Sequence, residues 1–238
     1  SAPMDFVAID FETATSVYSS VCSMGICVVE NDEIVTVKEF LIKPTPFVFN
    51  SYNIKIHGIT PEMVENEPTF DQLWDTIKPY VQNKLIVAHN ASFDTGALGA
   101  TLHTYGIEFP TLKYICTVKL SQDAYPDFPS HKLNNLCASL GITFSHHHAA
   151  EDAYACACVL LRIMHDYNLS SLDELCEKFN LEVGKIYPNC RVPCLKKKKK
   201  KAKKDTAAKK DKPKCNISYK LKKAVKSKTE TAKKSDTI

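Results

Sequence analysis

The stretch Phe6-Val7-Ala8-Ile9-Asp10-Phe11-Glu12-Thr13 determines the expected fold. Its apolar first half is typical of a buried strand, and it continues into two carboxylates two positions apart. Because residues i and i+2 of a strand point to the same face, Asp10 and Glu12 are expected to project side by side. Two like charges that close are unfavourable unless a cation lies between them or one keeps its proton. The stretch therefore predicts either an acidic turn after a strand or half of a divalent-metal site.

The 238-residue chain is sharply divided in charge. Residues 1–194 carry 12 Lys and Arg against 23 Asp and Glu, a net charge of −11, and residues 195–238 carry 19 Lys against 4 acidic residues, a net charge of +15. The 44% of hydrophobic residues is enough for one substantial core. We therefore expect an acidic folded body and a lysine-rich, largely disordered tail, with a short strand around 217–221 inside the tail.

The sequence gives no sign of export or membrane insertion. No apolar run approaches the roughly 18–20 residues of a membrane span, and no basic-then-apolar signal peptide is present. We expect Met4 to be the natural first residue and the protein to be intracellular, in the cytoplasm or, in a nucleated cell, the nucleus. The ten cysteines are then expected as reduced thiols. A zinc site from Cys190, Cys194 and Cys215 is an alternative, although its spacing matches no common ligand pattern.

Alternating patterns along the chain predict an α/β domain with a mixed sheet. Strands are expected at 5–11, 22–30 and 34–42, with the last two joined by a hairpin turn at Asn31-Asp32. Thr60 and Pro61 are typical of a helix start. Further helices are expected at 69–82, 91–105, 131–139, 149–167 and 171–179, and further strands at 85–88 and 113–117, the latter as the last strand of the sheet. Ser171 and Glu174 are spaced as a capping box.

Two later acidic positions could complete the metal site. Asp94 follows the strand Leu85–Ala88 and falls in the first turn of the next helix, at the carboxyl end of the sheet, where open α/β sheets bind ligands. Asp152 opens the helix at 149–167. Each acid also has a purely structural explanation, since it complements a helix dipole. His147 and Asp152 would lie about 140° apart on one helix, so His147 is expected in the loop before it.

Taken together, these motifs resemble the DEDDh family of 3′–5′ exonucleases, the group of the DNA polymerase III epsilon subunit (DnaQ-like). The resemblance covers about residues 4–168 and consists of Asp10-Phe11-Glu12, His89-Asn90-Ala91-Ser92-Phe93-Asp94, and His147 followed by Ala149 and Asp152. His57-Gly58-Ile59-Thr60 and Ser130-His131-Lys132-Leu133-Asn134 resemble secondary features of the family. We therefore divide the chain into an exonuclease domain (4–168), a short helical extension (169–194) and the tail (195–238).

The resemblance implies a ribonuclease H-like fold and hydrolysis with two Mg²⁺ or Mn²⁺ ions, which carboxylate ligands suit. Asp10, Glu12, Asp94 and Asp152 would hold the metals, with Asp10 bridging both, and His147 would act as general base. Thr13, His57 and Ile59 match positions that border the terminal nucleotide in the family. The expected substrate is nucleic acid with a free 3′ end, with single-stranded DNA favoured, released as nucleoside 5′-monophosphates.

Three alternatives stay open. The enzyme could trim RNA instead of DNA, it could cut internally like a ribonuclease H-like endonuclease, or the domain could be a non-catalytic nucleic-acid-binding scaffold. The lysine tail is expected to contact phosphate backbone in a salt-dependent way, or else to serve only for solubility or localisation. A polymerase or repair partner is compatible with the resemblance, but no motif specifies one.

Overall fold

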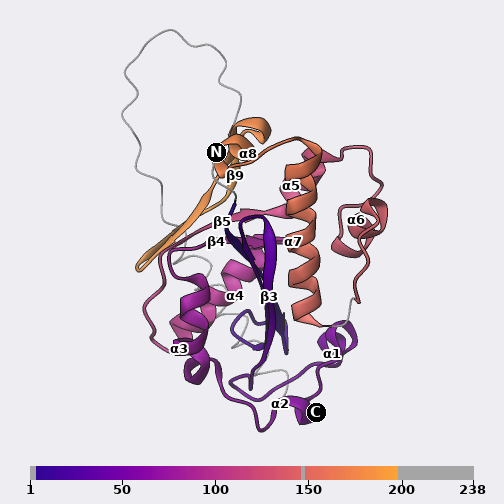
Figure 1. Ribbon diagram of the computed structural model, residues 1–238. Coiled ribbons are helices and arrows are strands. Elements are labelled where there is room, and N and C mark those ends of the chain that lie inside the picture. Colours follow the sequence, from indigo (N-terminus) through magenta and orange to yellow (C-terminus); the bar gives the residue numbers. More distant parts are fainter. Residues whose placement is uncertain (1–3, 146–147, 198–238) are drawn as a thin grey trace.

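The computed structural model describes residues 4–145 and 148–197, which form a seven-stranded sheet with helices on both faces (Figure 1). The strand order is β3-β2-β1-β4-β5-β7-β8, and β6 and β9 make a separate two-stranded sheet. The strands are β1 (Phe6–Thr13), β2 (Val21–Glu30), β3 (Glu33–Leu41), β4 (Leu85–Ala88), β5 (Leu112–Cys116), β6 (Leu181–Glu182), β7 (Gly184–Tyr187), β8 (Cys190–Val192) and β9 (Leu195–Lys196).

Strand β1 is at the centre of the sheet. It pairs antiparallel with β2 along its whole length and parallel with β4 on its other side, and β4 continues parallel to β5. The predicted mixed sheet is therefore confirmed. The predicted hairpin between β2 and β3 is also confirmed, and Asn31 and Asp32 at its turn both have positive φ (52° and 63°), as tight hairpin turns require.

The helices agree with the prediction best where a helical pattern of apolar residues extends over several turns. Helix α3 buries Phe70, Trp74, Ile77 and Val81, which repeat at helical spacing along one face. The helices are α1 (Ser51–His57), α2 (Pro61–Val64), α3 (Phe70–Val81), α4 (Ala91–Thr104), α5 (Thr117–Ala124), α6 (Leu133–Leu140), α7 (Ala149–Asp166) and α8 (Leu172–Phe179).

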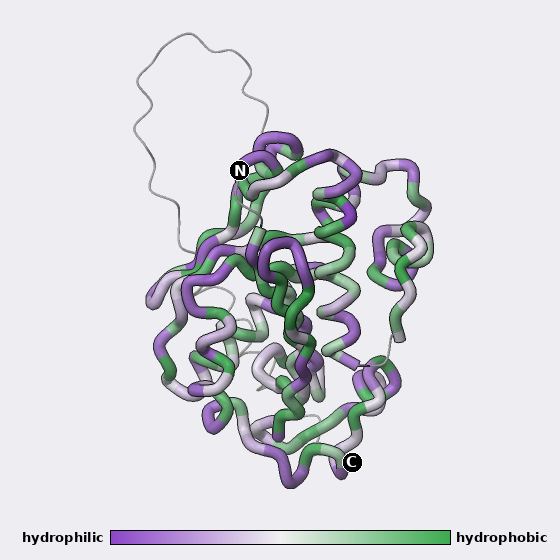
Figure 2. The backbone as a smooth tube through the Cα atoms, viewed as in Figure 1, coloured by the Kyte–Doolittle hydropathy of each residue, from purple (hydrophilic) through white to green (hydrophobic). Residues whose placement is uncertain are grey.

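Two helices cover opposite faces of the sheet and fix the core between them. Helix α7 packs across β1, β2 and β3 on one side, and α3 lies on the other, where the Phe70 ring contacts Phe11 of β1 (Figure 1). Along α7 the hydropathy alternates between green and purple in Figure 2, as expected for a helix with one buried face. This arrangement leaves the ends of β1 and β4 free to carry polar groups.

The prediction that residues 113–117 form the last strand is wrong. Beyond β5, the strands β7 and β8 extend the sheet, and β7 pairs antiparallel with β5. Gly184 of β7 lies opposite Tyr114, and a Cβ on it would come within 2.4 Å of the Tyr114 ring. Because these added strands are only three or four residues long, they carry no apolar run that would mark them in the sequence.

The chain beyond the domain is only partly covered. Strand β9 includes Leu195 and Lys196, at which the tail was expected to begin, and the predicted disorder and the strand at 217–221 otherwise fall outside the described residues. The division into three parts stays a prediction. In the described part of the chain, no helix combines the length and apolarity needed to cross a membrane.

Candidate metal centre

The carboxyl end of β1 supplies two acidic side chains on one face. Asp10 and Glu12 alternate with Ile9 and Phe11, which are each 1% exposed and belong to the core. Asp10 lies opposite Gly25 of β2. The strand therefore directs both carboxylates away from the core face that Phe11 shares with α3.

Asp94 reaches the same place from the neighbouring strand. Strand β4 runs parallel to β1, so both carboxyl ends meet at one edge, and Asn90 with φ of 74° turns the chain into α4. Asp94 in the first turn of α4 is only 1% exposed, and its Oδ1 accepts a hydrogen bond of 2.9 Å from the backbone N–H of Phe11. Phe11 lies between Asp10 and Glu12 in β1, so this bond fixes the Asp94 carboxylate beside both of them.

Asp152 arrives on helix α7, which approaches β2 unusually closely. A Cβ built on Gly25 would lie 1.9 Å from the carbonyl oxygen of Ala149, the first residue of the helix. Only glycine allows this contact, because any side chain would push the start of α7 away from the sheet. Asp152 is 8% exposed in the first turn. Gly25 thus brings Asp152 to the end of β1.

These side chains form a compact carboxylate cluster. One oxygen from each of Asp10, Glu12 and Asp152 lies within 4.8 Å of the other two. Burial raises the pKa of Asp10 well above its usual range, and the negative charges of Asp94, Glu12 and Asp152 raise it further. Burial also raises the pKa of Asp94, although the hydrogen bond from Phe11 opposes the shift. The cluster is thus electrostatically unfavourable without a counter-charge.

The cluster fits a divalent cation. Oδ2 of Asp10 is buried, and no group in the described part of the chain offers it a hydrogen bond. A buried carboxylate oxygen without a partner is costly, and a cation in contact with it would remove that cost. Carboxylate oxygens are the ligands that Mg²⁺ and Mn²⁺ prefer. Asp10, Glu12 and Asp152 form the only such group that the described residues contain. The alternative zinc site stays untested, because Cys215 lies outside the described residues.

Comparison with known proteins agrees with this geometry. Residues 7–160 match the RNase_T family, described as Exonuclease. The chain belongs to this exonuclease family. The predicted membership in the DEDDh, DnaQ-like group of 3′–5′ exonucleases is thereby confirmed, and members of the group generally use divalent metals.

The relatives of this exonuclease family member include longer proteins. A PolC-type DNA polymerase III from Halalkalibacterium halodurans is 32% identical over 165 residues, which are 68% of this chain and 11% of the polymerase. That of Clostridium perfringens is 32% identical over 194 residues, 76% of this chain and 13% of the polymerase. The chain therefore spans about a tenth of the length of these curated relatives.

Solved structures confirm the ribonuclease H-like fold. Exonuclease X in complex with 5′ overhanging duplex DNA is 25% identical, with a TM-score of 0.57 over 71% of this chain and 99% of that chain. The nuclease domain of 3′hExo, described as a DEDDh family member bound to rAMP, is 16% identical, with a TM-score of 0.58 over 69% and 93% of the two chains.

The expected general base of the exonuclease, His147, lies outside the described residues. Helix α7 begins at Ala149 with His148 as its cap, so His147 precedes the helix, as the sequence predicted. Its role stays a prediction.

The three positions expected to border the terminal nucleotide are buried beside the end of β1. Thr13, His57 and Ile59 are 5%, 7% and 3% exposed. The N–H of Ile59 donates to Nδ1 of His57 (2.9 Å), so Nε2 carries the proton and donates to the carbonyl oxygen of Thr13 (3.0 Å). Burial lowers the pKa of His57, which agrees with a neutral ring. These contacts secure the strand end next to Glu12, and a nucleotide contact stays a prediction.

His89, at the start of the second motif, connects that motif to the secondary motif at 130–134. Its Nε2 donates to the carbonyl oxygen of His131 (2.7 Å), and its Nδ1 accepts from the Thr117 hydroxyl (2.8 Å). Burial lowers the pKa of His89 to about 4, so the ring is neutral at physiological pH. His89 thus holds the loop before α6 against the end of β4.

Gly25 is a positioning residue that the sequence reasoning did not single out, and His89 was quoted there as part of a motif without a role of its own. A glycine inside an apolar strand such as β2 signals a close approach by another backbone, and that signal was present. What the sequence could not show is that the approaching element is α7.

Proposed function

We propose that this chain is a metal-dependent 3′–5′ exonuclease that acts on DNA and releases nucleoside 5′-monophosphates. The observation that carries the proposal is the carboxylate cluster, in which Asp10 has a buried oxygen that no group in the described part of the chain bonds. A cluster with this cost is difficult to reconcile with a non-catalytic scaffold, since a scaffold gains nothing from it.

In the proposed mechanism, four carboxylates would together hold two Mg²⁺ ions. Asp10, Glu12, Asp94 and Asp152 would supply the oxygen ligands that hold the ions. When bound, the two ions would stabilise the attacking and leaving oxygens and lower the pKa of the attacking water. His147 would accept the proton of that water.

Preference for DNA rests on the relatives. The curated relatives at about 30% identity are PolC-type DNA polymerases, and Exonuclease X, at 25% identity, is described with duplex DNA. RNA trimming is the second candidate, because the structure of a 3′-exonuclease with a histone mRNA stem-loop shares the fold. A contact to the 2′-hydroxyl would distinguish the two.

The test is a gel assay with single-stranded DNA and RNA of the same sequence, labelled at the 5′ end, in Mg²⁺, Mn²⁺ or EDTA. We expect a ladder that shortens from the 3′ end, faster on DNA, and abolished by EDTA and by Asp10→Ala. Asp75→Ala is the matched control, because Asp75 is exposed on α3, away from the cluster. Cleavage of circular single-stranded DNA would instead identify an endonuclease, and intact binding without cleavage would favour the scaffold.

We also propose that the lysine tail holds substrate near an acidic body that would otherwise repel it. Residues 195–238 carry a net charge of +15, and lysine–phosphate contacts weaken steeply with salt. A chain that ends at Leu195 should lose activity at 150 mM salt and regain it at low salt. Equal activity of both chains at every salt concentration would leave the tail without this role.

A further inference from the structure

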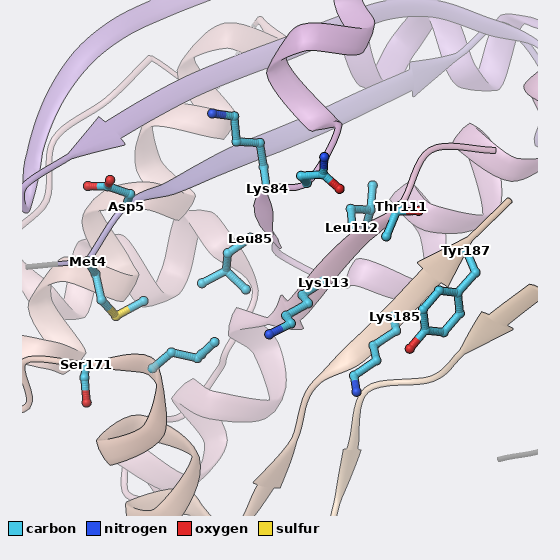
Figure 3. Close-up of a pocket in the computed structure, with 12 residues that line it drawn as sticks. Met4, Asp5, Lys84, Leu85, Thr111, Leu112, Lys113, Ser171, Lys185 and Tyr187 are labelled. Carbon is cyan, nitrogen blue, oxygen red and sulfur yellow. The ribbon is translucent and has the colours of Figure 1, made fainter. Parts of the chain in front are cut away.

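A second site lies at the opposite edge of the sheet from the carboxylates. A groove of about 570 Å³ opens at the amino ends of β4 and β5, where helix α8 begins beside them (Figure 3). Its volume falls in the usual range for ligand pockets. None of Asp10, Glu12, Asp94 and Asp152 lines this groove.

Lysines gather along this groove. Lys84 directly precedes β4, Lys113 lies in β5 and Lys185 in β7, and all three line the groove (Figure 3). They are three of only 12 Lys and Arg in residues 1–194, a segment with a net charge of −11. The local charge of the groove is therefore opposite in sign to the net charge of residues 1–194.

Two of the lysines face each other directly. Lys113 and Lys185 are cross-strand partners in the antiparallel β5–β7 pair, so their side chains stand on the same face. Like charges in this position are destabilising. Among the described residues, none of the three lysines forms an ion pair with an acidic side chain. Asp5 is the one acidic side chain that lines the groove, and its Oδ1 accepts a hydrogen bond from the N–H of Asn31 (2.8 Å). The groove thus presents three lysines without an acidic partner.

The walls between the lysines are apolar. Met4 and Leu112 are buried at 5% and 3% exposure, and Leu85 and Leu172 are half-buried against the groove. A ligand that fills the groove must therefore combine negative charges with apolar groups. Inorganic phosphate alone would leave the apolar surface uncovered, and a nucleic-acid strand would find only one aromatic ring, Tyr187, on which to stack its bases.

We propose that this groove binds an acidic peptide segment of a protein partner. Carboxylates of the peptide would neutralise Lys113 and Lys185, and its apolar side chains would cover Leu85 and Leu172. The exonuclease's own tail is excluded as the occupant by its charge, since it carries 19 Lys against 4 acidic residues. The site is separate from the carboxylate cluster and does not depend on the proposed nuclease function.

The test measures binding of a fluorescein-labelled ten-residue peptide of alternating Asp and Leu to the full chain by fluorescence anisotropy. The test variant is Lys113→Gln/Lys185→Gln. The control is Lys38→Gln/Lys78→Gln, which removes the same charge from exposed positions on β3 and α3 that do not line the groove. A peptide with Asn in place of Asp and another with Asn in place of Leu complete the set, and thermal unfolding verifies that all variants fold.

The expected result is at least a ~10-fold weaker affinity for the test variant and little change for the control, together with weaker binding of both altered peptides. A photo-reactive version of the peptide should cross-link to segments 84–85, 111–113 or 185–187. Equal affinity of the two variants, or cross-links only beyond residue 195, would overturn the proposal by assigning the binding to the lysine tail. If the test variant binds single-stranded DNA more weakly but binds the peptide as tightly as the unaltered chain, the groove is a nucleic-acid site and the proposal is overturned.

Discussion

The two ends of the same strands carry opposite charges in different surroundings. At the carboxyl ends of β1 and β4, the carboxylates are buried or half-buried, and burial together with the neighbouring negative charges raises the pKa of Asp10. At the amino ends of β4 and β5, Lys84 and Lys113 are exposed, and solvent screens them. Gathered like charge thus constrains a protein most strongly where it is buried. The acidic end therefore needs a cation or a retained proton to relieve its repulsion, whereas the basic end tolerates an empty groove.

The largest effect is expected from removing one charge at the acidic end. Asp10→Asn should lower exonuclease activity by roughly 10³-fold or more, because a ligand expected to hold both metals loses its charge. The same substitution should raise the thermal stability of the protein in EDTA, since it relieves repulsion among buried carboxylates. Activity assays and calorimetry check the two parts separately. Lower stability in EDTA would show that Asp10 is needed for folding and contradict the electrostatic account.

The next largest effect is expected at Gly25. Gly25→Ala places a Cβ 1.9 Å from the Ala149 carbonyl oxygen, so the start of α7 must move. We expect a loss of about 1–3 kcal/mol in unfolding free energy and up to ~10²-fold in activity, because Asp152 shifts relative to Asp10. Gly99→Ala is the matched control, since a Cβ there meets nothing within 4 Å. If both variants keep full activity, α7 does not depend on this close approach.

The third prediction concerns pH and metal. Because the pKa values of Asp10 and Asp94 are raised in the folded state, folding retains protons there that the unfolded chain loses near the ordinary value of 3.8. In EDTA, stability contributed by these groups is present at low pH and is lost as the pH rises from this value through the raised values. Excess Mg²⁺ should restore it at neutral pH. Melting temperatures between pH 4 and 8, with and without Mg²⁺, measure the effect. Asp10→Asn should flatten the EDTA curve.

The smallest effect is expected at the basic end. The Ser171 hydroxyl accepts a hydrogen bond from the N–H of Glu174 (3.1 Å) and caps α8 beside the lysine groove. Ser171→Ala should cost about 1 kcal/mol in unfolding free energy and leave exonuclease activity unchanged. Ser171→Asp should keep the cap. A loss of activity in the folded alanine variant would show that the two ends of the sheet are coupled.

The sequence predicted those parts of the fold that carry a strong local pattern. Strands β1 and β2 are rich in apolar residues, a recognisable turn joins β2 to β3, and α3 and α7 have a clear helical period. Strand β7 has no such signal, because Gly184 and Ile186 are its only buried residues and it depends on Tyr114 of a distant strand. Helix α5 was missed because it begins at Thr117, directly after β5, without a turn to separate them.

The sequence predicts which residues form the candidate site better than it predicts the contacts that bring them together. The order of Asp10, Asp94 and Asp152 along alternating strands and helices implied a common edge, and the structure brings Asp10, Glu12 and Asp152 together there. The Ser171 cap was also expected, but its reciprocal bond goes from Ser170 to Glu174 instead. The contact of Gly25 with α7 joins parts of the chain far apart in sequence, and local patterns carry no information on such contacts.

The distance along the chain between β1 and α7 has a consequence for protein synthesis. The ribosome completes β1, with Asp10 and Glu12, long before it makes Ala149–Asp166, the helix that brings Asp152 and packs across the first three strands. Contacts between such distant segments form late. A nascent chain therefore carries an incomplete carboxylate cluster until nearly the whole domain has emerged. The carboxylate cluster is therefore completed only after Asp152 has emerged, and the 72 residues that follow α7 give the helix time to pack before synthesis ends.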